Sequence, residues 1–122
     1  MNKTQAVQEF WSSFGIPAYD KNTVPDDAVM PYITYEVSTG SMDSVLPWNA
    51  SLWYRTKSWR DIELKVLEIA RAIGGMGYYS IKIDEGYLWL TQGTPFAQRV
   101  PDDDDTVRRI YLNVTAEFLT AY

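Results

Sequence analysis

Residues 107–119, VRRIYLNVTAEFL, are the stretch that decides the fold of this chain. Apolar residues occupy every second position from 110 to 118, and mostly polar residues stand between them. A period of two is typical of a strand that buries one face. Slipping the register by one residue would turn the whole apolar set outward, so the pairing of this strand is firmly specified. We predict a long strand over 107–119 with one face in the core.

Two segments have the period of an amphipathic helix. Residues 2–14 carry one apolar stripe, and Gly15 with Pro17 ends it. Residues 59–73 begin after Ser58, which stands three residues before Asp61 in a capping-box-like arrangement. The first stripe is Val7, Phe10, Trp11 and Phe14; the second is Trp59, Ile62, Val66, Ile69 and Ile73, widened by Leu67 and Ala70.

Four further stretches are predicted to be strands: 32–37, 78–84 and 87–92 by their alternation, and 50–56 because it is rich in Trp and Tyr. The last two are predicted to form a hairpin through the turn at 84–86. The segments 18–30, 41–49 and 93–105 are predicted to be loops. Strands that follow one another with few helices indicate an α+β domain. We therefore predict a single domain, 1–122, with a mainly antiparallel sheet and two flanking helices.

Composition excludes several function classes. The chain has no Cys and no His, which excludes disulfides, thiolate metal sites and Ser-His-Asp catalysis. Its net charge of −5 argues against a protein that grips nucleic acid, although DNA could still pass it. No signal peptide and no apolar run long enough for a membrane span stands out, so we expect a soluble, cytosolic protein.

Catalytic and cofactor motifs are missing from the sequence. There is no P-loop and no GxGxxG, and the glycines at 74–77 follow a predicted helix, where they serve as a helix stop. Carboxylate pairs at Asp26–Asp27 and Asp84–Glu85 fall in predicted turns, where such residues are common. We expect no enzymatic activity, no cofactor and no metal.

The most conspicuous charge cluster is Asp102, Asp103, Asp104 and Asp105. It has three interpretations: an extended, solvated loop tip, a site for a divalent cation, or an acidic patch that lines a pore or docks a basic partner. The ligand spacing of known calcium loops is absent, which disfavours the cation site. The sequence does not decide between the other two interpretations, the solvated loop tip and the acidic patch.

Two predicted loops carry side chains that loop chemistry does not explain. Residues 41–49 contain Met42, Leu46 and Trp48, and residues 93–101 contain Phe96 and Arg99. These side chains either fold back as lids on the core or anchor a neighbouring subunit. The aromatic fraction of 15% leaves the same two interpretations open for the whole chain, because large aromatic residues fill small cores and also dominate interfaces.

Four segments together resemble a known family: PYITY at 31–35, ASLWYR at 50–55, LWLTQGTPFAQR at 88–99 and RRIYLNV at 108–114. They are similar to small tail proteins of tailed bacteriophages, in particular the tail-terminator or tail-completion proteins of phages and prophages. The likeness runs through most of the chain from residue 25 onward. It rests on distributed segments and not on a catalytic motif.

The resemblance implies an α+β subunit that forms a homo-oligomeric, hexameric ring. The ring would cap the tail tube, end its polymerisation and join it to a head or neck connector protein, with DNA passing through the hole without specific binding. Such a protein is assembled in the host cytoplasm and ends in the virion tail. The alternatives are a head–tail connector or a tail tube subunit, and, outside this class, a small enzyme or ligand-binding domain.

Overall fold

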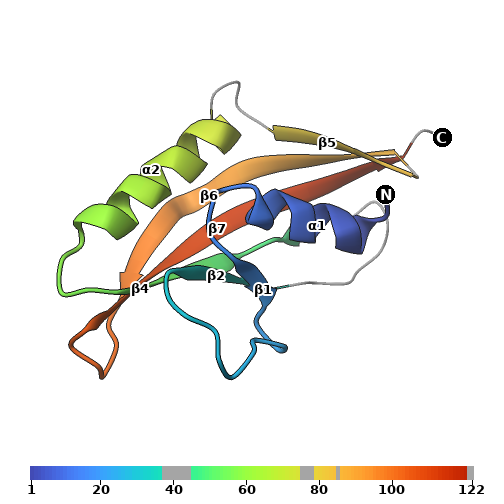
Figure 1. Cartoon of the computed structure of the whole chain (residues 1–122). Helices are drawn as coiled ribbons and strands as arrows, with labels where there is room; N and C mark the ends of the chain where they lie inside the picture. The colour runs from blue at the N-terminus through green and yellow to red at the C-terminus, as the bar shows by residue number, and fades with distance from the viewer. Residues whose placement is uncertain (37–44, 75–78, 85, 121–122) are drawn as a thin grey trace.

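The computed structural model describes residues 1–36, 45–74, 79–84 and 86–120. These residues form two helices and one seven-stranded sheet, which confirms the α+β class (Figure 1). Hydrogen-bonded neighbours follow the order β1-β2-β4-β7-β6-β5, and β3 pairs with β7 outside that path. The strands are β1 (Ala18–Asp20), β2 (Tyr32–Tyr35), β3 (Val45–Pro47), β4 (Ala50–Arg55), β5 (Tyr79–Ile83), β6 (Gly86–Val100) and β7 (Val107–Thr120).

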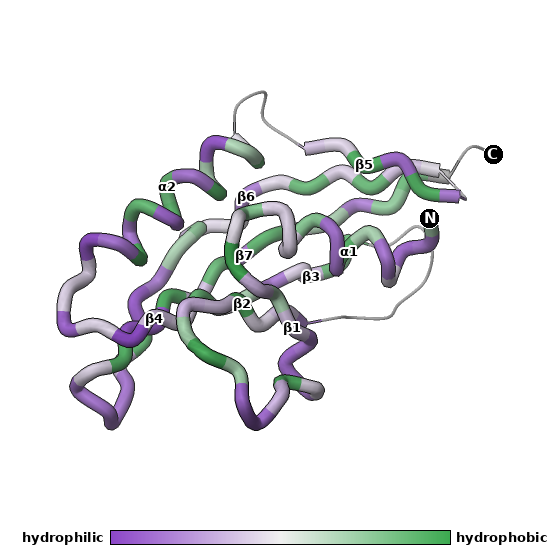
Figure 2. Tube along the Cα trace, viewed as in Figure 1, coloured by the Kyte–Doolittle hydropathy of each residue, from purple (hydrophilic) through white to green (hydrophobic). Residues whose placement is uncertain are grey.

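The strand β7 connects the two halves of the sheet. It pairs antiparallel with β6 along one side and with β4 and then β3 along the other. The predicted alternation is confirmed, and hydrophobic positions recur along the neighbouring strands as well (Figure 2). Its inward residues are Ile110, Leu112, Val114, Ala116 and Phe118, all buried.

Both helices, α1 (Lys3–Ser12) and α2 (Arg60–Gly74), cover the same face of the sheet, since their buried residues join the core formed by the inward strand residues (Figure 1). A capping box starts α1, in which the side chains of Asn2 and Gln5 each accept the other residue's backbone N–H. α2 begins within one residue of the predicted position. The hydroxyl of Ser58 accepts the N–H of Arg60 at 3.1 Å, but the N–H of Ser58 donates to Thr56 and not to Asp61, so the predicted capping-box pair is not formed.

The core stripe of α2 is narrower than the sequence predicted. Ile62, Val66, Ile69 and Ile73 are buried, as expected. Leu67 is 45% exposed, so the prediction that it widens the stripe is wrong. At about 100° per residue, position 67 lies roughly 140° around the helix from Ile62, on the side away from the sheet.

The predicted loop over 93–105 is wrong for its first half. β6 runs through it to Val100, because a register shift between Gln92 and Ala97 accommodates Pro95, which cannot donate to a strand ladder. Gly93 precedes this irregularity, where a Cβ would lie 2.8 Å from the Cβ of Asn113. A glycine therefore permits the close approach of β6 to β7.

Two short strands lie in segments predicted to be loops. β1 pairs parallel with β2, and β3 pairs antiparallel with β7. Three residues are too few to show a period, and Pro47 in β3 also disfavours a strand. The ends of the predicted strands at Val37 and Tyr78 lie outside the described residues.

No described helix combines the length and the apolar character that crossing a bilayer requires.

Leu112→Ala should destabilise the domain by about 2–5 kcal/mol, because Leu112 is fully buried in β7 and its truncation leaves a cavity. Leu64→Ala makes the same chemical change at a side chain that is 54% exposed, and should stay within about 0.5 kcal/mol of the parent. Urea unfolding measures both. Equal losses at the two positions would contradict the assigned core.

Candidate subunit interface

The sheet has one face that neither helix covers, which we call the open face. It carries the outward residues of every strand, since side chains alternate between the two faces. Pairing places Tyr32, Trp53 and Arg109 in one row across β2, β4 and β7. Further along β7, the row through Glu117 includes Trp89 of β6 and Val45 of β3. The two rows belong to halves of the open face with different chemistry.

In the half of the open face beside β1, the outward side chains contact one another. Tyr19 meets Tyr32 edge-on at 5.7 Å, and the Tyr32 and Trp53 rings lie 6.5 Å apart. The indole N–H of Trp53 donates to the Thr34 hydroxyl at 2.8 Å, and the Arg109 guanidinium stacks 4.6 Å from the Trp53 ring. These aromatic and cation–π contacts hold the side chains of this row in place and cover part of their apolar surface. This half of the open face therefore depends less on contact with another subunit.

The other half presents exposed apolar side chains, which we call the open-face patch. It consists of Val45, Tyr87, Trp89 and Leu119 around the carboxylate of Glu117. Val45 is 60% exposed, Tyr87 45% and Trp89 38%, and Leu119 is half-buried. Exposed apolar residues that lie together are more typical of a protein-binding surface than of a surface that only contacts solvent.

The structure places the predicted anchors of the segment 41–49 in different environments. Trp48 is 1% exposed and belongs to the core, so it acts as the lid that the alternative interpretation describes. Leu46 is half-buried on β3, opposite Ala116. Met42 lies outside the described residues. Because its partner Ala116 faces the core, the side chain of Leu46 lies on the helix-bearing side of the sheet and not in the open-face patch.

Phe96 and Arg99 lie on the side of the sheet that carries the helices. Phe96 is partly buried and packs against the core. The Arg99 guanidinium stacks 4.4 Å from the Trp59 ring, and its Nε donates to Glu63 at 3.0 Å. Arg99 therefore fixes β6 to the start of α2, whereas Phe96 packs against the core, so both residues have contacts within the subunit.

The acidic residues 102–105 form the turn between β6 and β7, not an extended tip. The carboxylate of Asp104 accepts hydrogen bonds from the backbone N–H and the hydroxyl of Thr106. A guanidinium nitrogen of Arg55 lies 3.4 Å from the same carboxylate. Lys57 lies 3.6 Å from Asp105. Asp102 accepts the backbone N–H of Asp104, whereas Asp103 makes no such contact with the described residues. Neighbouring cations thus offset part of this charge.

No group of three or more potential metal ligands occurs among the described residues. A hollow of about 210 Å³ lies between α1 and β5, lined mainly by apolar residues such as Phe10 and Tyr79. Of its described lining residues, Glu9 supplies the one carboxylate. The hollow lacks the converging carboxylates that would favour the enzyme alternative.

Sequence reasoning missed the open-face patch although one signal for it was present. The predicted alternation of 87–92 puts Tyr87 and Trp89 on the face opposite Leu88 and Leu90, and it is confirmed, because both leucines are fully buried. If the leucines face the core, the two aromatic rings must face outward.

The pKa of Asp104 is held below its usual value, first by the hydrogen bonds from the backbone and the hydroxyl of Thr106, then by Arg55. A depressed carboxyl pKa favours the folded state above the unfolded pKa, and this contribution is lost as pH falls through the folded value. Thr106→Val removes the hydroxyl bond and keeps the backbone one, so it should raise the Asp104 pKa in part, and Arg55→Ala should also raise it. Carboxyl-carbon NMR titration measures both shifts, and an unchanged pKa in Thr106→Val would contradict the assigned hydroxyl hydrogen bond.

Comparison with known proteins yields one informative likeness. No protein-family model and no curated protein matches the chain. Among solved structures, a chain from a structure described as the virion of a native gene transfer agent particle matches with a TM-score of 0.59. The match covers 91% of this chain and 90% of the other, at 15% sequence identity. At that identity the likeness establishes a shared fold, complete over nearly the whole length of both chains.

Proposed function

We propose that this chain is a structural protein of a phage-like particle, and specifically a tail terminator that forms a ring on the end of the tail tube. The observation that carries the proposal is the shared fold, which spans 91% of this chain and was found in a chain of a gene transfer agent virion. A fold alone does not determine function, so the proposal also depends on the surface of the molecule.

The surface supports an assembly role. The open face leaves aromatic and aliphatic side chains uncovered, and Trp and Tyr are enriched where proteins bind one another. The partners we propose are further copies of this chain, the tail tube protein and a head or neck connector protein. The hexameric state and the location in the virion tail follow from the resemblance to tail terminators.

The acidic character of the chain agrees with a channel that DNA passes. The net charge is −5, and the exposed Asp102 and Asp103 add negative potential at one end of the sheet. Like charge prevents the phosphate backbone from adhering, so DNA moves past without being held. We propose no catalytic step for this chain.

The proposal is tested by adding the chain to polymerising tube subunits of the phage or prophage that encodes it. A terminator binds the growing end, so tubes become shorter as its concentration rises, and electron microscopy measures their lengths. Label attached to the chain should appear at one tube end. The matched reaction without the chain sets the uncapped length distribution.

Tube lengths that do not change with the concentration of the chain would contradict a terminator. Filaments formed by the chain alone would instead indicate a tube subunit. Binding to isolated capsids through the portal, with no effect on tubes, would indicate a connector.

A further inference from the structure

We propose that the solvent-facing side of α2 in one copy packs onto the open-face patch of the next copy. This inference deepens the proposed function and rests on the chain forming a ring. It assigns both sides of the contact to named residues, which the resemblance to tail terminators does not.

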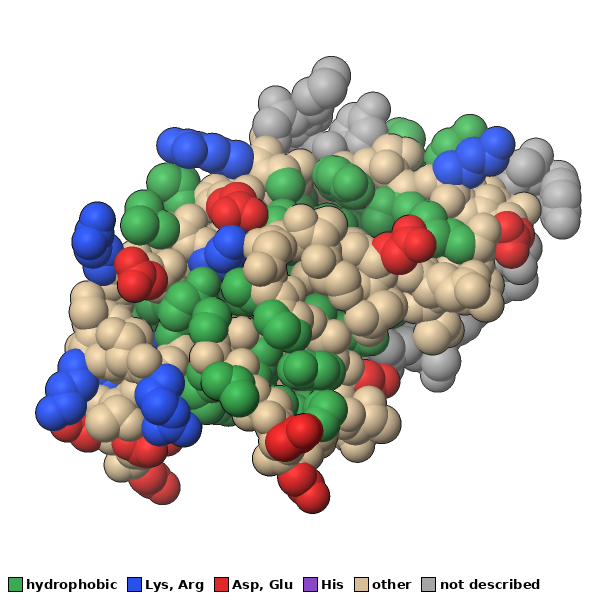
Figure 3. Space-filling model, viewed as in Figure 1, with side chains coloured by type: hydrophobic (Ala, Val, Ile, Leu, Met, Phe, Trp, Pro, Cys, Tyr) green, Lys and Arg blue, Asp and Glu red, His purple; other side chains and the backbone are tan. Residues whose placement is uncertain are grey.

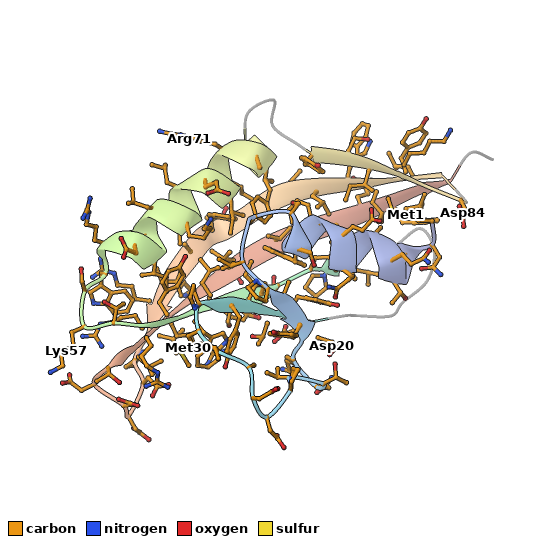
Figure 4. The ribbon with its side chains drawn as sticks, viewed as in Figure 1. Met1, Asp20, Met30, Lys57, Arg71 and Asp84 are labelled. Atoms are coloured by element: carbon orange, nitrogen blue, oxygen red, sulfur yellow. The ribbon has the colours of Figure 1, made fainter. Side chains whose placement is uncertain are left out.

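The first surface is a stripe on α2, which we call the α2 stripe: Arg60, Leu64, Leu67 and Arg71. Its residues are spaced by 4, 3 and 4 positions, so they follow one line along the helix. At about 100° per residue, that line lies roughly opposite the buried residues of α2. Leu64 is 54% exposed and Leu67 45%, and Figure 4 shows Arg71 directed away from the sheet.

The arginines of the α2 stripe have no ionic partner in the described part of the chain. The ion pairs found there involve Arg55 and Arg99 but neither Arg60 nor Arg71. Figure 3 shows the helix-bearing face, with Lys and Arg side chains along the α2 side and hydrophobic ones beside them. Two exposed leucines between two unpaired guanidiniums therefore match a partner surface that is apolar and carries a carboxylate.

The open-face patch has that chemistry. Its apolar residues surround Glu117, and this carboxylate makes no ion pair with a described residue. The leucines of the α2 stripe can cover Val45 and Leu119. The guanidiniums can reach Glu117 and stack on Tyr87 or Trp89, an arrangement that suits Arg in particular. The two surfaces are thus complementary in both hydrophobicity and charge.

The dimensions also agree. The stripe from Arg60 to Arg71 is about 16 Å long at 1.5 Å per residue. The strands β3, β7, β6 and β5 span three spacings, or about 14 Å, across the patch end of the sheet. A helix laid across these strands therefore covers the whole patch.

A second copy of this chain is the occupant, because the chain itself carries the complementary surface on the opposite side of the subunit. The patch faces outward from the sheet, and the α2 stripe faces outward from the helix layer. A contact between two different surfaces is heterologous, and repeating it gives a closed ring where its rotation closes and an open filament where it does not. We propose the closed ring, in keeping with the proposed function.

The first test uses disulfide trapping, which is selective because the chain has no Cys. Leu67→Cys and Tyr87→Cys are prepared separately, and both positions are exposed, so folding should be retained and circular dichroism checks it. Mixed and oxidised at high concentration, the two variants should give a 67–87 dimer. Each variant alone should give little, because a heterologous contact does not place like positions together.

Carrying both changes in one chain should produce a ladder that ends at the size of the closed ring. Asp103→Cys is the matched control, exposed and outside both surfaces, and should not enter the ladder. Dimers of like positions, equal trapping through position 103, or no trapped dimer in the mixture would each overturn the inference.

The second test reverses charges. Glu117→Arg should weaken self-association about tenfold, because it places like charges at the contact. Arg60→Glu with Arg71→Glu should do the same, and mixing these variants should restore association. Asp103→Arg changes the net charge as Glu117→Arg does but should leave association unchanged. Analytical ultracentrifugation measures all four.

Failure of mixed variants to recover, or an equal effect of Asp103→Arg, would overturn the contact. The tube-length assay is scored in parallel on the parent chain. Shortened tubes with no 67–87 trapping would reject this contact and leave the terminator role standing, whereas trapping with unchanged tubes would do the reverse.

Discussion

The packing of both helices against one face of the sheet is the constraint on which the rest of the structure depends. The inward residues of β7, from Ile110 to Phe118, meet α1 and α2 in a single core, so every strand has one face fixed by burial. The opposite face then has no helix to cover it. The two halves of this open face differ. In one half, Tyr32, Trp53 and Arg109 stack on one another, and in the other half Val45, Tyr87 and Trp89 are exposed.

Periodicity predicted the parts of the fold whose burial is one-sided. β7, α1, α2 and the Leu88–Leu90 alternation of β6 were identified because hydrophobic burial enforces a period over many residues. Elements that depend on tertiary contacts could not be predicted in this way. β1 and β3 are each three residues long and exist because β2 and β7 offer them an edge, and β6 continues past Pro95 because β7 keeps it paired.

The candidate site was less predictable than the fold. Trp48, Phe96 and Arg99 are predicted loop residues, but Trp48 is in the core, Phe96 packs against it, and Arg99 connects β6 to α2. An exposed aromatic residue inside a strand has the same local signature as a buried one, and only the direction of the neighbouring leucines separates them. The complementarity of the α2 stripe and the open-face patch also required three dimensions, since Arg71 and Glu117 are far apart in sequence.

In the ring that we propose, the open-face patch binds another copy of the chain at the end of a tube. Electron cryomicroscopy of tail tubes capped by this chain tests it most directly. The account predicts a closed ring of this chain at one tube end, with α2 of each subunit seated on the patch around Glu117 of its neighbour. A ring in which that patch faces solvent or the lumen, or a tube end without this chain, would contradict it.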